Sequence, residues 1–375
     1  MPSADSAYNH FSGKRFVPML KGCVRALLLH DVCEEIRLEE LRAALGARRA
    51  EPSFKHPTPE HVRFEKPPVI ETGPGISLSS GEALRTQIKY YDYGVVSVVF
   101  ELRFEGDWQS LNAVAARLVP SAELERKAQE IVRERLRREA VASAIVRGYS
   151  EWISEDYYVF ELNEIEGNPI GADLLSQHGS EIARILRGEQ TELARSERAD
   201  ALQASLSYYP NDLVVVGWNA ALIYDAPAGA DAAVQILEYA NSQLLEFRHY
   251  DDLLTRELDV VYRSLKRKPG MLARWRMGRE ASRLNGVTVE VAELVERSET
   301  AIKFVSDMFA ARQYRLAANK VGVPEYKNLV NEKLKTAENL YRYLVDEFHQ
   351  SRDFVLEVMV LIILIIELVF LFKGK

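Results

Sequence analysis

The hydrophobic pattern of the chain changes near residue 225. Before this point, short runs of β-branched and aromatic residues alternate with amphipathic segments. After it, apolar residues recur at steps of three and four over long stretches, which is the period of a helix. We therefore predict an α+β domain over 21–226 and a helical region over 231–353, with a flexible N-terminus over 1–20. A proline-rich loop is expected at 51–74.

Short strands are expected throughout the α+β domain. They are predicted over 23–30, 85–91, 95–104 and 157–162, with two more around a turn at Gly217 and Asn219 in 212–225. Helices are predicted over 38–45, over 107–148 with a break at Pro120, and over 172–186. Because the strands lack regular βαβ spacing, the pattern favours an antiparallel sheet with helices on one face.

The helical region is predicted to begin at Asp231, a candidate N-cap, and to run to about residue 266. A second helix is expected over 287–320, and a third leads from residue 325 into the C-terminal tail. The tetrapeptide VGVP at 321–324 separates them. Heptad helices joined by such a short turn predict an antiparallel coiled-coil hairpin over 287–353.

The most apolar part of the chain is the tail at 354–372. These 19 residues would form a helix of about 28 Å, close to the roughly 30 Å of a bilayer core. We predict a transmembrane helix, with an apolar packing helix buried in an oligomer as the alternative. Glu367 would lie about 6 Å from its middle, where a charge costs roughly 2.5–3.5 kcal/mol. It should therefore be protonated, paired or in contact with a partner helix.

The composition of the chain limits the classes of partner and site that it can have. The chain has 48 Lys+Arg against 55 Asp+Glu, which argues against a protein-wide nucleic-acid surface and against DNA as a partner. Cys23 and Cys33 are too few for a disulfide framework or a cysteine-based zinc site. The N-terminal residues contain no signal peptide, so the body is expected on the cytoplasmic side of the membrane.

One cluster of functional side chains falls on the first long helix. It consists of Glu246, Arg248, His249, Asp251 and Asp252. Glu246 and His249 have the spacing of half a di-iron carboxylate site, but no second Glu-x-x-His is present. Ordinary surface ion pairs are the alternative. Asp251 lies in the apolar seam and needs a partner, so we predict that Arg248 pairs with it and fixes the docking of the helix on the sheet.

A second cluster is the basic segment 263–283, with eight Lys/Arg and one acid. Its candidate binding residues are Arg263, Lys266, Arg267, Lys268, Arg274, Trp275 and Arg276. Basic residues around an aromatic side chain can bind lipid headgroups or an RNA backbone. A solvated connector is the alternative. The antiparallel hairpin would bring this segment near the bilayer, which favours headgroups.

Three segments resemble the family called "required for meiotic nuclear division", the YagE-type domain of unknown function. They are SYYPNDLVVVGWNAALIYD at 207–225, LEYANSQLLEFRHYDDLLTREL at 237–258 and SRDFVLEVMVLIILIIELVF at 351–370. The resemblance implies an α+β domain, a helical hairpin and a C-terminal membrane segment. Relatives include a mitochondrial inner-membrane protein that supports translation. Without a presequence, this chain is identified as a prokaryotic member, single-pass in the cytoplasmic (inner) membrane.

No nucleotide, metal or nucleophile motif is found, so we expect no cofactor and no enzymatic activity. The sequence favours a membrane-anchored scaffold or adaptor that binds membrane lipid and forms a homo-oligomer through hairpin and tail. An adaptor for RNA or the ribosome is one alternative. The other is a membrane-bound enzyme with a cleft at Glu246–Asp251.

Overall fold

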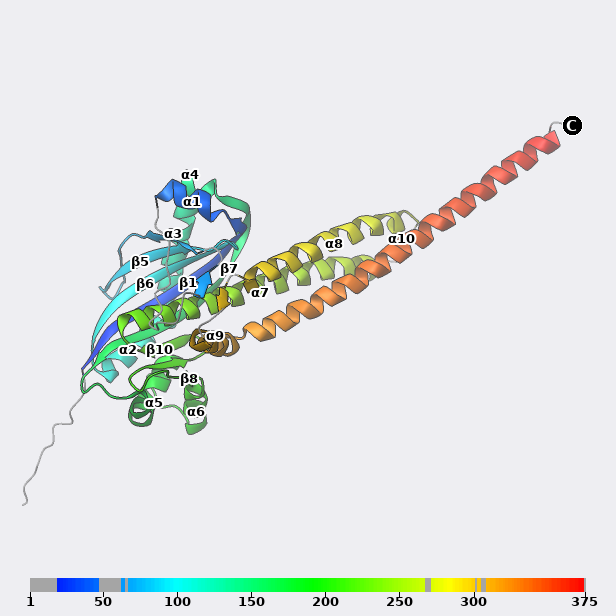
Figure 1. Cartoon of the computed structure of the whole chain (residues 1–375). Helices are drawn as coiled ribbons and strands as arrows, with labels where there is room; N and C mark the ends of the chain where they lie inside the picture. The colour runs from blue at the N-terminus through cyan, green and yellow to red at the C-terminus, as the bar shows by residue number, and fades with distance from the viewer. Residues whose placement is uncertain are drawn as a thin grey trace, which may run out of the picture.

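The computed structural model describes residues 19–46, 62–64, 67–266, 271–300, 302–304 and 308–373. Within these ranges, side chains at 62–64, 271–277, 294, 296–300, 302–304, 351–353, 355 and 370–373 are not described. Figure 1 shows a sheet domain from which a bundle of long helices projects, with the C-terminal helix extending farthest.

The domain is built on a nine-stranded sheet in the order β3-β5-β6-β1-β7-β10-β9-β8, with β4 paired to β5. Its two longest strands, β1 (Leu20–Ile36) and β7 (Ile145–Ile165), lie side by side at the centre. The β7–β10 pair is parallel and all other pairs are antiparallel. The remaining strands are β3 (Val69–Thr72), β4 (Ile76–Ser77), β5 (Ala83–Tyr90), β6 (Val95–Gly106), β8 (Ser205–Leu206), β9 (Leu213–Val216) and β10 (Ala220–Tyr224). The predicted α+β class is confirmed.

Helices cover both faces of the sheet, because β1 is apolar on both sides. Val24 and Leu28 point into one core, while Leu27 and Leu29 point into the other. The first core is closed by α1 (Leu38–Leu45), α2 (Trp108–Leu118), α3 (Ala122–Leu136), α4 (Glu139–Ala142) and α5 (Gly171–Arg187). The second is closed mainly by α7 (Pro227–Lys266). The expectation that helices lie on one face was wrong.

Most local predictions in this domain agree with the observed elements. Asp107 caps α2 by accepting a hydrogen bond from the Ser110 amide at 2.8 Å, and the chain breaks between α2 and α3 around Pro120. The helical prediction over 107–148 was too long, because β7 already begins at Ile145. Helix α6 (Arg195–Gln203) follows α5.

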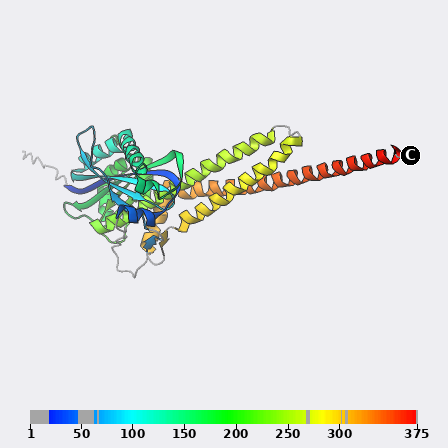
Figure 2. The ribbon, with the colours of Figure 1, turned by 90° about the horizontal axis from the view of Figure 1, so that it is seen from above.

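The projecting arm contains three helices. Helices α7 and α8 (Met271–Thr300) form an antiparallel pair, and α10 (Val323–Lys373) packs beside both (Figure 2). Leu258 and Val261 of α7, Leu284 of α8 and Leu344 of α10 form its core. The predicted two-helix hairpin is therefore incomplete, since α7 belongs to the same bundle.

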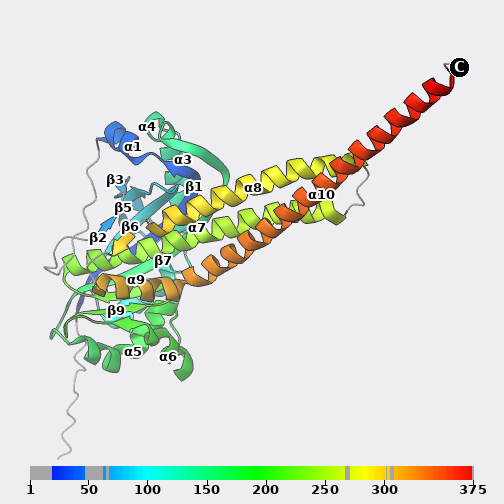
Figure 3. The same ribbon diagram turned by 45° about the vertical axis from the view of Figure 1, so that its right-hand side comes forward.

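The predicted helix over 287–320 was also wrong. Its first half belongs to α8, and strand β11 (Ile302–Phe304) then pairs with β2 (Val62–Phe64) before α9 (Met308–Val321) begins. The break at VGVP is confirmed: α9 and α10 meet at Gly322, whose φ of 94° suits glycine. Figure 3 shows α9 beside the sheet and α10 leaving it.

Within the described residues, no helix combines the length and the apolar character needed to cross a membrane. The predicted transmembrane helix over 354–372 is the distal end of α10, where it continues beyond the α7–α8 pair.

Candidate functional site

Helix α7 contacts the sheet through an unusually polar surface. Glu238, Ser242, Glu246 and His249 are 0–8 % exposed, although they lie on a helix that packs against a hydrophobic core. Burying such groups without partners costs several kcal/mol, so each needs a hydrogen bond or a counter-charge. Three of the partners come from β1, β5 and the turn after β5, and they fix the position of α7 on the sheet. Glu246 instead accepts a hydrogen bond from Tyr250 of α7 itself.

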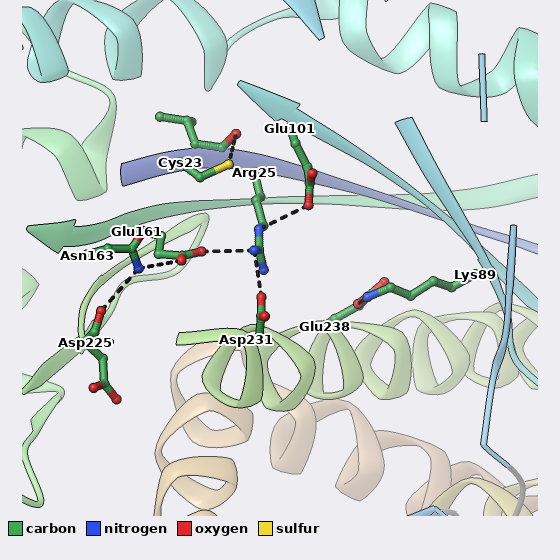
Figure 4. Close-up of polar contacts among 10 residues, drawn as sticks. Cys23, Arg25, Lys89, Glu101, Glu161, Asn163, Asp225, Asp231 and Glu238 are labelled. Carbon is green, nitrogen blue, oxygen red and sulfur yellow. Dashed lines mark hydrogen bonds and ion pairs between the residues drawn. The ribbon is translucent and has the colours of Figure 1, made fainter. Parts of the chain in front are cut away.

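The first contact centres on Arg25 of β1 (Figure 4). Its guanidinium lies 2.7 Å from a carboxylate oxygen of Asp231 on α7, 3.2 Å from Glu161 on β7 and 3.4 Å from Glu101 on β6. Glu101 is directly opposite Arg25 in the β1–β6 register. Three carboxylates thus converge on one cation, and Asp231 ties the start of α7 to the sheet.

The charges in this network respond to burial and to one another. Burial by itself lowers the pKa of the Arg25 guanidinium, but Glu161 and Asp231 outweigh it, so that pKa is raised. Burial also raises the pKa of Glu161, against the opposing effect of Arg25. Burial is the main cause that raises the pKa of the Cys23 thiol to about 11. Cys23 is therefore a neutral thiol at physiological pH.

A groove of about 680 Å³ opens beside Arg25, at the end of the sheet next to Pro227, the first residue of α7. Four cations and four carboxylates line it: Lys21, Arg25, Arg85, Arg103, Glu101, Glu105, Glu161 and Glu164. Because the two signs are equal in number and interleaved, the groove favours neither an anionic nor a cationic ligand as a whole. No sequence pattern predicts this groove.

The second contact is a buried ion pair between Lys89 of β5 and Glu238 of α7 (Figure 4). Their side chains are only 9 % and 0 % exposed. One helical turn farther along, the Tyr93 and Ser242 hydroxyls share a hydrogen bond of 2.7 Å. A buried pair of this kind loses much of its attraction to desolvation, yet removing one partner leaves a stranded charge. Its main effect is to specify one docking position.

The third contact joins His249, one of the predicted residues, to the sheet. His249 Nδ1 lies 2.7 Å from an Asp31 carboxylate oxygen on β1, and the Tyr149 ring stacks on the imidazole at 4.6 Å. The Tyr250 hydroxyl donates to Glu246. Burial raises the pKa values of Asp31 and Glu246 and lowers that of His249. This cluster therefore retains carboxyl protons at a pH where surface carboxylates have lost theirs.

The predicted pairing of Arg248 with Asp251 is wrong. Arg248 forms an ion pair with Glu155 of β7, and Asp251 lies 2.5 Å from the Lys333 ammonium of α10. The two residues are only three apart, but on the helix they face different neighbours. Asp251 thus contacts the arm and not the sheet. Asp252 is exposed and has no ion pair within the described part of the chain.

The basic segment is only partly described. Arg263 pairs with Asp259 one turn earlier on α7, and Lys266 is the last residue of that helix. Arg267 and Lys268 lie outside the described residues. Arg274, Trp275 and Arg276 are in the first turns of α8, and their side chains are not described.

The distal part of α10 carries the largest exposed apolar surface in the described structure. Twelve large apolar side chains between Phe354 and Val369 are 47–57 % exposed, and they face every direction around the helix. Glu367 is exposed among them. Among the described residues, no group of three or more His, Cys, Asp or Glu is placed to hold a metal ion.

These features define an α+β domain, with a mixed and mostly antiparallel sheet, that carries a long helical arm. A family model described as "uncharacterized protein MJ0711, N-terminal domain" matches residues 21–231, more than half of the chain. The chain belongs to this family.

One curated relative is uncharacterized protein MJ0711 of Methanocaldococcus jannaschii. It is 18 % identical over 195 residues, which are 52 % of this chain and 60 % of the relative. The chain thus matches less than two thirds of that protein's length. No solved structure matches the chain.

The resemblance to the "required for meiotic nuclear division" family is therefore wrong. The segments that carried it encode a β-hairpin (β9 and β10), a buried helix (α7) and an apolar helix end (α10). Apolar residues dominate them, and unrelated sequences with the same local structure share such patterns.

Proposed function

We propose that this chain is a membrane-anchored, non-enzymatic scaffold whose helical arm holds the α+β domain at a membrane. The distal part of α10 would insert into the bilayer, with the domain on the cytoplasmic side. The observation that carries this proposal is the twelve exposed apolar side chains between Phe354 and Val369. In water, an apolar surface of this size is unfavourable and has to be covered.

The distribution of these side chains favours lipid as the cover. A helix that packs in a coiled coil is apolar along one seam, with polar residues on its other side. From Leu361 to Ile366, six consecutive apolar residues cover every side of α10. Lipid contacts all sides of a helix, whereas a single partner helix contacts one. Glu367 then marks the place where two tails would meet, as a polar group shielded from lipid.

Vesicle flotation tests the proposal. The full chain would be translated in a cell-free system with phospholipid vesicles present, and its floating fraction measured after a high-salt wash. We expect the chain to float and a variant lacking 354–375 to remain in the load. Ile362→Asp with Ile365→Asp should also abolish flotation, because each buried carboxylate costs roughly 2.5–3.5 kcal/mol.

A matched control is available on the same helix. Leu329 and Tyr343 are 44 % and 48 % exposed on the part of α10 nearer the domain. Leu329→Asp with Tyr343→Asp adds the same two charges and should leave flotation unchanged. If the truncated chain floats as well as the full chain, the tail is not the anchor. A wild-type chain that stays in the load as a large oligomer would also contradict the proposal.

The same preparation tests tail association. Glu367→Leu should reduce crosslinking between chains in vesicles while leaving flotation intact, because it removes the polar contact and keeps the apolar surface. Unchanged crosslinking would show that Glu367 does not mediate association.

A further inference from the structure

A second groove lies in the arm, between α8 and α10, with a volume of about 600 Å³. This volume is within the range of small-molecule sites. The groove exists where α8 has a glycine: a Cβ on Gly278 would lie 3.2 Å from the Phe348 ring, so the two helices approach closely there. Ser282 and Asn285 continue one wall toward the domain.

The contact between Gly278 and Phe348 also fixes the position of the groove along α10. Phe354, the first exposed residue of the apolar stretch, is six residues beyond Phe348, or about 9 Å along the helix. The headgroup layer of a bilayer is roughly 5–8 Å thick on each side. If the apolar stretch lies in the hydrocarbon, this end of the groove lies at the headgroups.

The charge of the groove is distinctive. Arg279 and His349 line it, and none of the described carboxylates does, although the chain has more Asp+Glu than Lys+Arg. Arg279 has no ion pair with any described residue. By contrast, Arg283, one turn farther along α8, lies 2.6 Å from Glu257. An uncompensated guanidinium beside an imidazole, with a hydroxyl and an amide nearby, fits a phosphate that carries polar substituents.

We propose that this groove binds the headgroup of an anionic phospholipid. The phosphate lies at Arg279 and His349, and headgroup hydroxyls reach Ser282 and Asn285. The inference rests on the proposed function in one respect, because insertion of the α10 tail is what brings lipid to the groove. Lipid binding here would set the depth and rotation of the arm in addition to its attachment.

Lipid binding can be measured without a bilayer. Full-length chain in a neutral detergent is titrated with phosphatidylglycerol or phosphatidylcholine, and bound lipid is counted by native mass spectrometry. Arg279→Gln should lower the affinity for phosphatidylglycerol by about fivefold, because one cation contributes roughly 1 kcal/mol to binding of an anionic lipid. The affinity for phosphatidylcholine should not change. Ser282→Leu, which fills the groove, should weaken phosphatidylglycerol binding without changing a charge.

Arg283→Gln is the matched control, since it removes a cation from the same helix outside the groove. Equal phosphatidylglycerol binding by wild type and Arg279→Gln would overturn the proposal, as would an equal loss with Arg283→Gln. Competition with glycerol phosphate distinguishes a lipid headgroup from a free phosphate compound as the source of the anion. If glycerol phosphate competes as strongly as the lipid, the groove binds a free phosphate compound and the lipid assignment fails.

The two proposals fail separately. A chain that does not float with vesicles but binds phosphatidylglycerol through Arg279 in detergent would remove the anchor and retain the lipid site. A chain that floats but shows no preference for phosphatidylglycerol would retain the anchor and remove the site.

Discussion

Helices α7 and α10 are the two longest in the described part of the chain. They differ in the kind of side chain that each one buries and exposes. Helix α7 buries carboxylates, an imidazole and amides against the sheet, whereas the distal part of α10 exposes leucines, isoleucines and valines. The buried polar groups of α7 are matched by partners within the chain, such as Lys89 and Asp31. The exposed groups of α10 have no such partners among the described residues. We therefore look for the function of the chain at the distal part of α10, whose exposed apolar side chains have no partners among the described residues.

The largest expected effect comes from leaving a charge of α7 without its partner. Lys89→Met should lower the free energy of unfolding by about 3–5 kcal/mol, because Glu238 would remain buried alone. Urea unfolding followed by circular dichroism measures this loss. The double variant Lys89→Met, Glu238→Leu should recover most of it. Lys21→Met, at an exposed ion pair of 3.7 Å with Glu105, should cost less than about 1 kcal/mol.

The two parts of α10 can be compared by one substitution. Leu344 is 0 % exposed in the arm core, and Leu364 is 55 % exposed beyond it. Leu344→Ala should cost about 2–5 kcal/mol of unfolding free energy because it leaves a cavity. Leu364→Ala should stay within about 0.5 kcal/mol. Equal losses would show that the distal part of α10 is packed against another surface.

A buried histidine in β1 predicts a pH dependence. Burial lowers the pKa of His30 to about 4, while the unfolded chain titrates near 6.5. Between these values the unfolded state binds more protons at this residue, so the contribution of His30 to stability should rise with pH from 4 to 6.5, by about 3 kcal/mol at most. The raised pKa values of Asp31 and Glu246 act in the opposite direction. Measured by unfolding at several pH values, the difference in stability between wild type and His30→Phe should therefore change in favour of wild type as the pH rises from 4 to 6.5.

The smallest effect is expected on the solvated side of α7. Arg263 and Asp259 form an ion pair whose side chains are 70 % and 57 % exposed. Arg263→Gln should change the unfolding free energy by less than about 0.5 kcal/mol. A larger loss would indicate that this end of α7 has a contact beyond that pair.

Sequence patterns were sufficient where structure depends on neighbours along the chain. The turn at Gly217 between β9 and β10 and the break at Gly322 were both predicted. Gly322 has a positive φ, and a Cβ on Gly217 would lie 2.8 Å from the Ala220 carbonyl oxygen, so both sites require glycine. The predicted residues Glu246 and His249 both lie on the buried side of α7. The partner of His249, Asp31, is more than two hundred residues earlier, and a helical period contains no information about which strand lies opposite.

The predictions that were wrong or missing also concern residues whose partners lie far away in the sequence. Arg248 was the nearest cation to Asp251, but Lys333 occupies that position in space. Lys89 was not selected because an isolated lysine in a strand is usually solvated. The groove beside Arg25 requires β1, β5, β6 and β7 to be assembled before it exists. The strand at 302–304 was assigned to a helix because its partner, β2, lies far away in the sequence.

The joint at Gly322 gives α10 a mechanical role. From Val323 to Phe354 the helix rises about 46 Å, so it sets the distance between the domain and the surroundings of the apolar stretch. It is also a lever. With 51 residues, α10 is about 75 Å long. Because it packs on α7 and α8, it would tilt together with the arm, and a tilt of roughly 10° would displace its tip by about 13 Å. Small changes where α9 meets the sheet would thus be magnified at the far end.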